Sequence, residues 1–283
     1  MTEAERKQII DLVQREVVPA IGCTEPIAVA LCVAKATETL GTRPEKINVL
    51  LSANILKNAM GVGIPGTDMV GLPIAVALGA LIGKSEYQLE VLKDSNPAAV
   101  DEGKRFIAEK RINISLKENI SEKLYIEVCC ESGENKATAI IAGGHTTFIY
   151  IARNGGILFS RQNASSEETK EQTVDLTLRK VYDFAMDAPL DEIRFILETA
   201  RLNKAAAESS FDKNYGHGLG RMLRGTYEHK ILGDSVFSHI LSYTSGACDA
   251  RMAGAMIPVM SNSGSGNQGI AATLPVLSFA EDI

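Results

Sequence analysis

Apolar residues recur at helical spacing over much of the first 110 residues. They lie three and four positions apart over residues 3–18, and Pro19 ends the pattern. Thr24 is a typical N-cap residue and Pro26 a typical first-turn residue, and together they predict a second helix that ends at Gly41. The other elements predicted in this region are a buried strand over 46–52, a glycine-rich ordered loop over 61–71, and helices over 72–82 and 97–110.

The pattern changes at Ile112 to short apolar or alternating runs with turn residues between them. Such runs predict consecutive antiparallel strands, here over 112–119, 123–130, 136–143 and 147–153. A polar stretch follows as the predicted linker, over 161–170, and helical spacing then returns over 174–186, 190–208 and 219–243. The sequence therefore predicts an α+β fold, with helices packed on an antiparallel-rich sheet in residues 1–165 and an all-helical domain in residues 166–283.

The helical pattern at the end of the chain, TLPVLSFAEDI, runs to Ile283 without a capping residue. We therefore expect the helical domain to be cut short at this point. A shortened helical domain leaves apolar surface uncovered, which predicts self-association as a homo-oligomer.

Composition and charge narrow the class of protein. Hydrophobic residues make up 45% of the 283 residues and charged residues 23%, which is enough apolar sequence for a substantial core. The net charge of −6 argues against nucleic acid or an anionic membrane surface as the main partner. The longest apolar stretch, 69–83, is too short to span a bilayer, and no signal-peptide core follows the charged N-terminus. We expect a cytoplasmic protein that acts on a small molecule.

The five cysteines are irregularly spaced, without a CxxC pair that would indicate a local zinc or cluster site. Cys23 stands just before the predicted second helix, where the helix dipole stabilises a thiolate and lowers the pKa of the thiol. Glu25 follows closely and is a candidate base or cation ligand. The alternative is that Cys23 is a small buried hydrophobic residue and that Glu25 merely favours the first helical turn.

The glycine-rich loop and the residues before it form a second candidate site. Lys57 and Asn58 precede Gly61, Gly66 and Thr67, and glycines expose backbone N–H groups that can bind an anion. Lys57 adds a positive charge, so the loop suits a substrate carboxylate. The residue order of a Walker A motif is absent. The alternative is an ordinary connection with a surface lysine.

A third candidate lies between two predicted strands, in a turn that contains His145 and Thr146. Histidine is the side chain that titrates nearest to neutral pH, so a general acid or base is one interpretation. A simply solvated turn residue is the other interpretation.

Small polar residues alternate with glycine near the end of the chain. They permit close backbone approach and supply hydrogen-bond donors for a carboxylate or an amino group. Arg251, a little earlier, offers a planar guanidinium to a carboxylate, and a structural ion pair explains it equally well. A flexible linker is the alternative for the glycine-rich residues, which are Asn262, Ser263, Gly264, Ser265, Gly266 and Asn267.

Five long motifs together resemble the L-cysteine desulfidase family. They are GCTEPIAVAL, LKNAMGVGIPGTDMVGLPIA, GGHTTFIY, IRFILETARLN and DARMAGAMIPVMSNSGSGNQGI, and the resemblance covers essentially the whole chain. This family is similar to the alpha-chain part of bacterial iron–sulfur L-serine dehydratases. The resemblance implies α,β-elimination without pyridoxal phosphate, in which L-cysteine gives sulfide, ammonia and pyruvate with the help of an oxygen-sensitive 4Fe–4S cluster.

Family members continue past the point that corresponds to Ile283. The resemblance implies that the cysteines that hold the cluster lie in that further region, so we expect no metal ligand among residues 1–283. Three other functions stay open. They are an iron–sulfur L-serine dehydratase, a non-catalytic small-molecule binding module, and a thiol enzyme that uses Cys23.

The chemistry implied by the resemblance assigns roles to the candidate residues. Removal of the α-proton of an amino acid needs a base, which His145 or a Cys23 thiolate supplies. It also needs hydrogen-bond donors that offset the growing negative charge. We expect Cys23 to line a cleft at a helix N-terminus, and we expect residues 57–66 and 261–269 to converge on one pocket.

Overall fold

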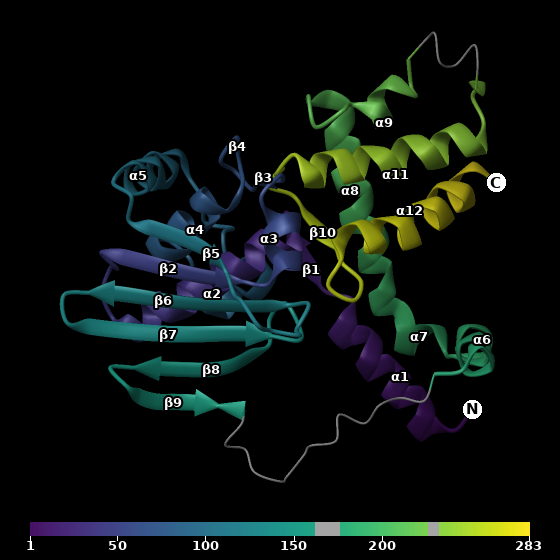
Figure 1. Cartoon of the computed structure of the whole chain (residues 1–283). Coiled ribbons are helices and arrows are strands. Elements are labelled where there is room, and N and C mark those ends of the chain that lie inside the picture. The colour runs from purple at the N-terminus through teal and green to yellow at the C-terminus, as the bar shows by residue number, and fades with distance from the viewer. Residues whose placement is uncertain (162–175, 226–231) are drawn as a thin grey trace.

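A six-stranded mixed sheet forms one half of the molecule in the computed structural model, which describes residues 1–161, 176–225 and 232–283 (Figure 1). The strands lie in the order β5 (Ile112–Leu116), β2 (Lys46–Leu51), β6 (Tyr125–Ser132), β7 (Asn135–Ala142), β8 (Phe148–Arg153) and β9 (Gly156–Ser160). Neighbouring strands are antiparallel, except that β2 and β5 run parallel.

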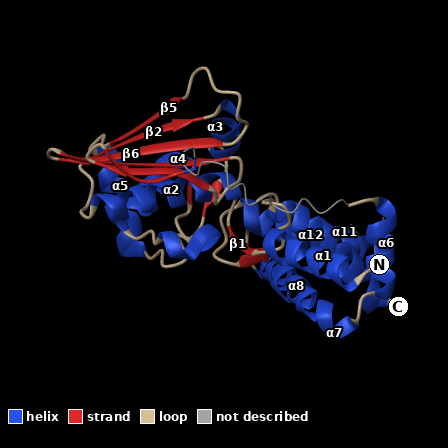
Figure 2. Ribbon diagram, turned by 90° about the horizontal axis from the view of Figure 1, so that it is seen from below, coloured by secondary structure: helices blue, strands red, loops and turns tan. Residues whose placement is uncertain are grey.

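Helices cover one face of this sheet (Figure 2). Residues of β6 alternate between the two faces, so Ile126, Val128 and Cys130 point into the core. On the other face, Glu127 pairs with Lys117 at 2.7 Å. The covering helices are α2 (Thr24–Leu40), which packs on the strands, and α4 (Leu72–Leu81) and α5 (Pro97–Ala108) behind it.

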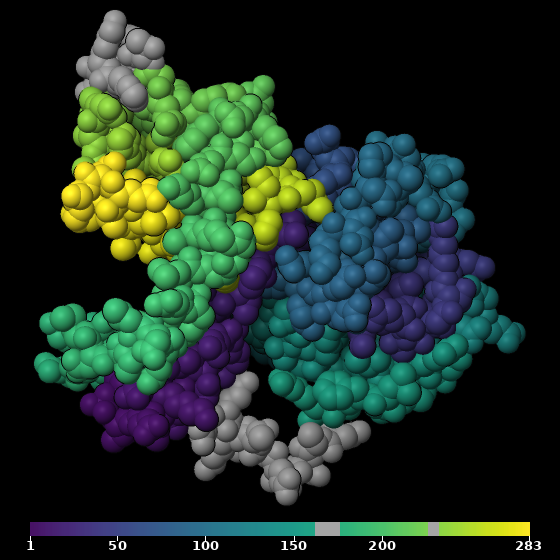
Figure 3. Space-filling view, turned by 180° about the vertical axis from the view of Figure 1, so that it is seen from behind, coloured from purple at the N-terminus to yellow at the C-terminus, as the bar shows by residue number. Residues whose placement is uncertain are grey.

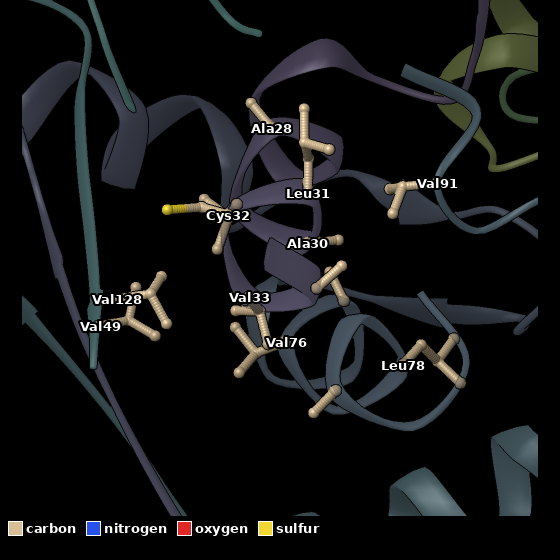
Figure 4. Close-up of a cluster of buried hydrophobic side chains, with 14 of the residues drawn as sticks. Ala28, Ala30, Leu31, Cys32, Val33, Val49, Val76, Leu78, Val91 and Val128 are labelled. Atoms are coloured by element: carbon tan, nitrogen blue, oxygen red, sulfur yellow. The ribbon is translucent and has the colours of Figure 1, made fainter. Parts of the chain in front are cut away.

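The helix α2 is buried along almost its whole length because it lies between the sheet and α4. Figure 4 shows its side chains between Val49 and Val128 of the strands and Val76 of α4. The two helices approach closely at Gly79, where an added Cβ would lie 2.6 Å from the carbonyl oxygen of Ala30. Glycine at this position therefore sets the separation of the two helices.

A group of helices forms the other half of the molecule. Its second apolar core lies between α8 (Leu197–Asp212), α11 (Val236–Met252) and α12 (Gly266–Asp282). Shorter helical elements extend this half, namely α6 (Leu178–Asp187), α7 (Leu190–Ile193), the 3-10 helix η3 (Arg194–Ile196) and α9 (Leu219–Met222).

The first helix of the chain also lies beside these helices (Figures 1 and 3). Arg6 of α1 (Glu3–Glu16) pairs with Glu192 at 2.8 Å. The following strand, β1 (Pro19–Ile21), pairs antiparallel with β10 (Pro258–Met260). This pairing ties the two halves together, because the chain continues from β1 almost directly into α2.

The α+β fold predicted from the sequence is confirmed, with most of the predicted helices and strands present. Helices and sheet occupy the N-terminal part, and helices dominate the C-terminal part, as expected. Four smaller elements complete the N-terminal part: α3 (Ala53–Ala59), β3 (Gly63–Ile64), β4 (Met69–Val70) and the 3-10 helix η1 (Ser85–Glu90).

Some predictions were wrong in detail. The strand over 112–116 runs parallel to β2, because the intervening helices return the chain to the same end of the sheet before β5 begins. The second helix begins at Thr24 with Cys23 as its N-cap, since the hydroxyl of Thr24 donates to Glu25 instead of capping. The 61–71 loop contains the β3–β4 hairpin. The helix predicted over 219–243 is divided between α9 and α11.

The predicted linker over 161–170 lies almost entirely outside the described residues, as does the start of the helix predicted from Val174. The domain division at residue 165 stays a prediction. Within the described ranges, the structure contains no helix with both the length and the hydropathy needed to cross a membrane.

The close approach at Gly79 generates a stability prediction. Gly79→Ala should lower the free energy of unfolding by about 1–3 kcal/mol, because the new methyl group presses on the backbone of Ala30. Urea denaturation measures this change. The matched control is Gly61→Ala, at a position with open space beside it within the described chain, which should change the stability by less than about 0.5 kcal/mol. Equal effects of the two substitutions would contradict the packing argument.

Candidate active site

Three segments that are far apart in the sequence meet beside the β1–β10 pair. They are the N-terminus of α2, the turn between β7 and β8, and the stretch that leads from the end of α11 to the start of α12 (Figure 1). Each of the two helix N-termini follows one strand of the pair, so the pairing of β1 with β10 brings both to the same place.

A tight turn directs the chain from β10 into α12. Asn262 and Ser265 exchange two backbone hydrogen bonds, and Ser263 and Gly264 between them have φ values of 49° and 75°. Positive φ at both central positions is the pattern of a type I′ turn, which favours glycine. Ser265 then caps α12 by accepting a hydrogen bond from the N–H of Gln268.

Arg251 lies at the end of α11 with 5% of its surface exposed. Its Nη1 donates to Oδ1 of Asn267 at 3.0 Å, and its guanidinium lies against Gly266, where a Cβ would clash with it. Its Nε is buried and has no hydrogen-bond partner, and no carboxylate of the described residues forms an ion pair with it. A buried cation without a counter-charge is costly, which indicates a site for an anion.

His145 lies close to this arginine, in the turn between β7 and β8. An added Cβ on Gly264 would lie 2.6 Å from its Nδ1, so the glycine permits the imidazole to pack against the 262–265 turn. Burial lowers the pKa of His145, and the nearby charge of Glu25 opposes this change while that of Arg251 adds to it. The imidazole is therefore neutral near pH 7 and able to accept a proton.

The same imidazole lines an open cavity of about 960 Å³. Its wall includes Thr146 and Gly264 from the two turns, and Tyr87 and Gln88 from η1. A small molecule can thus reach His145 from solvent.

Cys23 occupies the helix N-terminus, as predicted, but its chemistry differs from the prediction. The side chain is buried, and its thiol donates to Sδ of Met252 at 3.3 Å. Burial raises the pKa of Cys23, the charge of Arg251 opposes this, and that of Glu25 adds to it. The lowered pKa expected from the helix dipole is wrong, because loss of water around the thiolate outweighs the dipole.

Glu25 lies in the first turn of α2 and is partly exposed. Its Oε1 accepts a hydrogen bond from Nδ2 of Asn58 at 3.4 Å, and its Oε2 accepts one from the hydroxyl of Thr24 at 3.2 Å. The carboxylate influences the pKa values of both Cys23 and His145. The wall of the cavity beside His145 includes Ser263 and Gly264 but neither Glu25 nor any residue of 57–66. The convergence of 57–66 and 261–269 on one pocket therefore stays a prediction.

Other predicted ligands of the glycine-rich loop have different environments. Lys57 is an exposed residue of α3, and the space beside Gly61 is open within the described chain. The N–H of Gly66 donates to the carbonyl of Gly254 at 3.2 Å, and the hydroxyl of Thr67 donates to the carbonyl of Ile64 at 2.8 Å. The groups expected to bind an anion at these two positions are therefore already engaged within the protein.

Asn203 and Met252 belong to the site but were not predicted from the sequence. Asn203 of α8 is completely buried, accepts from the N–H of Met260 at 2.8 Å and donates to the carbonyl of Gly269 at 3.3 Å. It thereby holds both ends of the segment that contains the 262–265 turn. A buried amide needs such partners, so an asparagine within an apolar helical pattern was the available signal.

The cysteines do not assemble into a cluster site. Cys32 donates to the carbonyl of Ala139 at 3.3 Å in the core, Cys130 is buried in the sheet, and Cys129 lies on the opposite face from Cys130. In the part of the chain that the structure describes, no group of three or more Cys, His, Asp or Glu side chains could hold a metal ion. Because a 4Fe–4S cluster needs several convergent cysteines, these residues alone do not fit one.

The unpaired arginine generates a stability prediction. Arg251→Met should leave the free energy of unfolding unchanged or raise it by about 1 kcal/mol, because the buried guanidinium lacks a counter-charge. Urea denaturation measures the free energy of unfolding. The control is Arg6→Met, which removes an arginine that does pair with a carboxylate, that of Glu192. A loss of more than about 2 kcal/mol in Arg251→Met would show that the arginine holds the fold instead of a ligand.

The charges around His145 generate a prediction on titration. The imidazole pKa should lie below about 6.5, fall further in Glu25→Gln and rise in Arg251→Gln. Unfolding restores the ordinary pKa, so protonation of the imidazole is less favourable in the folded state than in the unfolded state. The free energy of unfolding should therefore be highest above about pH 6.5 and should decline as the pH falls below it. NMR titration of the imidazole resonances measures this, with His239 as internal reference, since hydrogen bonds to Asp282 and Asp234 raise its pKa. Shifts of the same sign in both variants would contradict the assignment.

Comparison with known proteins identifies the family of the chain. The profile described as serine dehydratase alpha chain matches residues 86–283. The chain is 79% identical to a UPF0597 protein of Bacteroides fragilis, 77% identical to one of Bacteroides thetaiotaomicron and 50% identical to one of Porphyromonas gingivalis, each over 100% of this chain. It spans 66% of the length of these curated relatives. No solved structure matches the chain significantly. The chain belongs to the serine dehydratase alpha chain family.

Proposed function

We propose that this chain carries the substrate site of a lyase that catalyses α,β-elimination on a small amino acid. The leading reaction converts L-cysteine to sulfide, ammonia and pyruvate, and L-serine dehydration is the alternative, which differs in the leaving group. The observation that carries the proposal is a buried arginine, without a counter-charge among the described residues, beside a neutral histidine. Membership of the serine dehydratase alpha chain family supports the same class of reaction.

The substrate carboxylate is assigned to Arg251 and the start of α12. The Nε of the guanidinium has no hydrogen-bond partner among the described residues, and a carboxylate accepts from a guanidinium with two oxygens at once. The N-terminus of α12 adds a partial positive charge at Gly266 and Asn267. Binding there stabilises the negative charge that grows when the α-proton leaves.

The α-proton is assigned to the imidazole of His145. Its pKa is lowered mainly by burial, so the ring is neutral and accepts a proton in the working pH range. Burial raises the pKa of Cys23, which makes that thiol a poor source of thiolate. We therefore favour His145 over Cys23 as the base.

The elimination breaks the Cα–H bond and the bond from Cβ to the leaving group, and forms a Cα=Cβ bond. The Cα–H electron pair becomes the Cα=Cβ bond, the proton goes to His145, and the β-sulfur leaves with the electrons of the Cβ–S bond. The enamine tautomerises to an imine, which water hydrolyses to pyruvate and ammonia. In the serine reaction the β-oxygen leaves instead.

An iron–sulfur cluster is typical of this family, and an open iron site would polarise the leaving sulfur or oxygen. The described residues of this chain do not fit such a cluster. Its ligands are proposed to come from the part of the protein that corresponds to the further length of the relatives. The residues of this chain would then bind, orient and deprotonate the substrate.

Activity assays with three variants test the proposal. The protein at the full length of its relatives, prepared anaerobically, should release pyruvate from L-cysteine or L-serine, with sulfide as co-product from L-cysteine. His145→Asn should lower kcat by at least about 10²-fold, and Cys23→Ala by much less. Cys129→Ala, in the sheet, is the control for the loss of a cysteine.

The relative rates with the two amino acids decide between the two leaving groups. Full activity of His145→Asn together with loss in Cys23→Ala would favour a thiol enzyme and overturn the assignment of the base. Binding of an amino acid without any release of pyruvate would instead identify a binding module.

A further inference from the structure

The last turn of α12 is held by charged side chains and not by apolar packing. Every residue of this helix after Ser278 is exposed. Two side chains of the turn nevertheless contact neighbouring helices. Glu281 pairs with Lys204 of α8 at 2.6 Å, and Asp282 pairs with His239 of α11 at 2.8 Å. The position of the turn therefore depends on whether these side chains keep their charges.

The imidazole of His239 lies between two carboxylates. Its Nδ1 is 2.8 Å from Oδ2 of Asp282, and its Nε2 is 2.6 Å from Oδ1 of Asp234, which precedes α11. An ionised carboxylate only accepts hydrogen bonds, and a neutral imidazole has a single N–H to donate. A neutral ring can therefore satisfy one of the two carboxylates, whereas an imidazolium donates to both. The contacts fit a protonated ring that joins the end of α12 to the start of α11 (Figure 1).

Two other features around the ring oppose its protonation. Arg224 lies on the wall of the same cavity of about 270 Å³, and the ring belongs to the first turn of α11, where the helix dipole disfavours a cation. The carboxylates outweigh both features. The hydrogen bond to Asp282, followed by that to Asp234, raises the pKa of His239, and partial burial opposes the change. Within the described chain, these three are the charged side chains that face the ring.

We propose that His239 is a proton-dependent clasp, which as an imidazolium joins the last turn of α12 to the start of α11 and on losing its proton releases that turn. The clasp does not depend on the proposed lyase activity. At their other ends α11 and α12 also meet, where Nη1 of Arg251 donates to Oδ1 of Asn267 at 3.0 Å. Neither of these side chains changes its charge at ordinary pH. Deprotonation of His239 thus frees one end of the helix pair and leaves the end at the candidate site fixed.

The clasped turn also forms part of an apolar groove of about 380 Å³ between α12 and α8. The α12 side of the groove is lined by Val276, Leu277 and Ala280. Ala280 lies two residues before Asp282, so the clasp fixes this wall while His239 is protonated. A rise in pH should therefore loosen the groove together with the end of the helix.

Amide hydrogen exchange in the last turn of α12 tests the clasp on the chain described here. Protection, corrected for intrinsic exchange rates, should fall about two- to fivefold between about pH 6 and about pH 9, since one partly exposed ion pair contributes that much. Because folding raises the pKa of His239, the stabilisation is complete below about pH 6.5, the pKa of an unfolded histidine. It is lost as the pH rises through the higher pKa of the folded state.

Substitutions on the same turn separate the clasp from the neighbouring ion pair. Asp282→Asn should lower the protection at about pH 6 to the level that wild-type protein has at high pH, and should remove the pH dependence. His239→Gln should do the same. The matched control is Glu281→Gln, whose partner Lys204 keeps its charge over this range. It should lower the protection by the same factor at both pH values.

NMR titration of the imidazole gives a second readout. The pKa of His239 should lie above about 6.5 in wild-type protein and should fall in both Asp282→Asn and Asp234→Asn. A pKa at or below about 6.5 would overturn the clasp, as would wild-type protection that does not change with pH. Dependence on pH that persists in His239→Gln would show that another group releases the turn, and would overturn the clasp as well.

Discussion

The antiparallel pairing of β1 with β10 is the constraint on which the candidate site depends. It places Pro19 opposite Met260, and Ser261 extends it by donating both its N–H and its hydroxyl to the carbonyl of Val18. One strand leads into α2 and the other leads through a tight turn into α12. The pairing therefore fixes where both helix N-termini lie, and with them Glu25 and Gly266. The same pairing holds together the side chains that we propose to bind and deprotonate the substrate.

Periodicity predicted the long elements well because burial follows a regular pattern along each of them. The alternation in β6 and β7 reflects one buried face, and the continuous apolar run of α2 reflects burial between a sheet and a helix. Periodicity could not predict the pairing of β1 with β10, which positions the candidate site. β1 has three residues, too few to show a period, and its partner is near the other end of the chain. The parallel direction of β5 likewise depends on the path of intervening helices and not on its own sequence.

Turn chemistry identified most of the candidate residues, but not what each of them does. The asparagine, serine and glycine pattern over 262–267 marked a special turn, and the structure places that turn against His145. The glycines of the 61–67 loop marked a close approach too, yet what approaches Gly63 is the backbone of Ala253 and Gly254. Glycine permits contact with a ligand or with another segment equally. The difference between the two loops lies in their partners, which a single sequence does not show.

Burial gives the site its chemical character. Removal of water around Cys23 and His145 moves their pKa values in opposite directions, yet both groups become neutral as a result. The guanidinium of Arg251 stays charged, because arginine does not lose its proton at any ordinary pH. The poorly solvated surroundings that suppress ionisation of the thiol and the imidazole also strengthen the attraction between Arg251 and an incoming carboxylate. Burial of the arginine is unfavourable while no anion is bound, so the free energy of that unpaired charge becomes binding energy when a carboxylate arrives. With a neutral histidine alongside, the same desolvation would serve both the recognition and the proton removal that we propose.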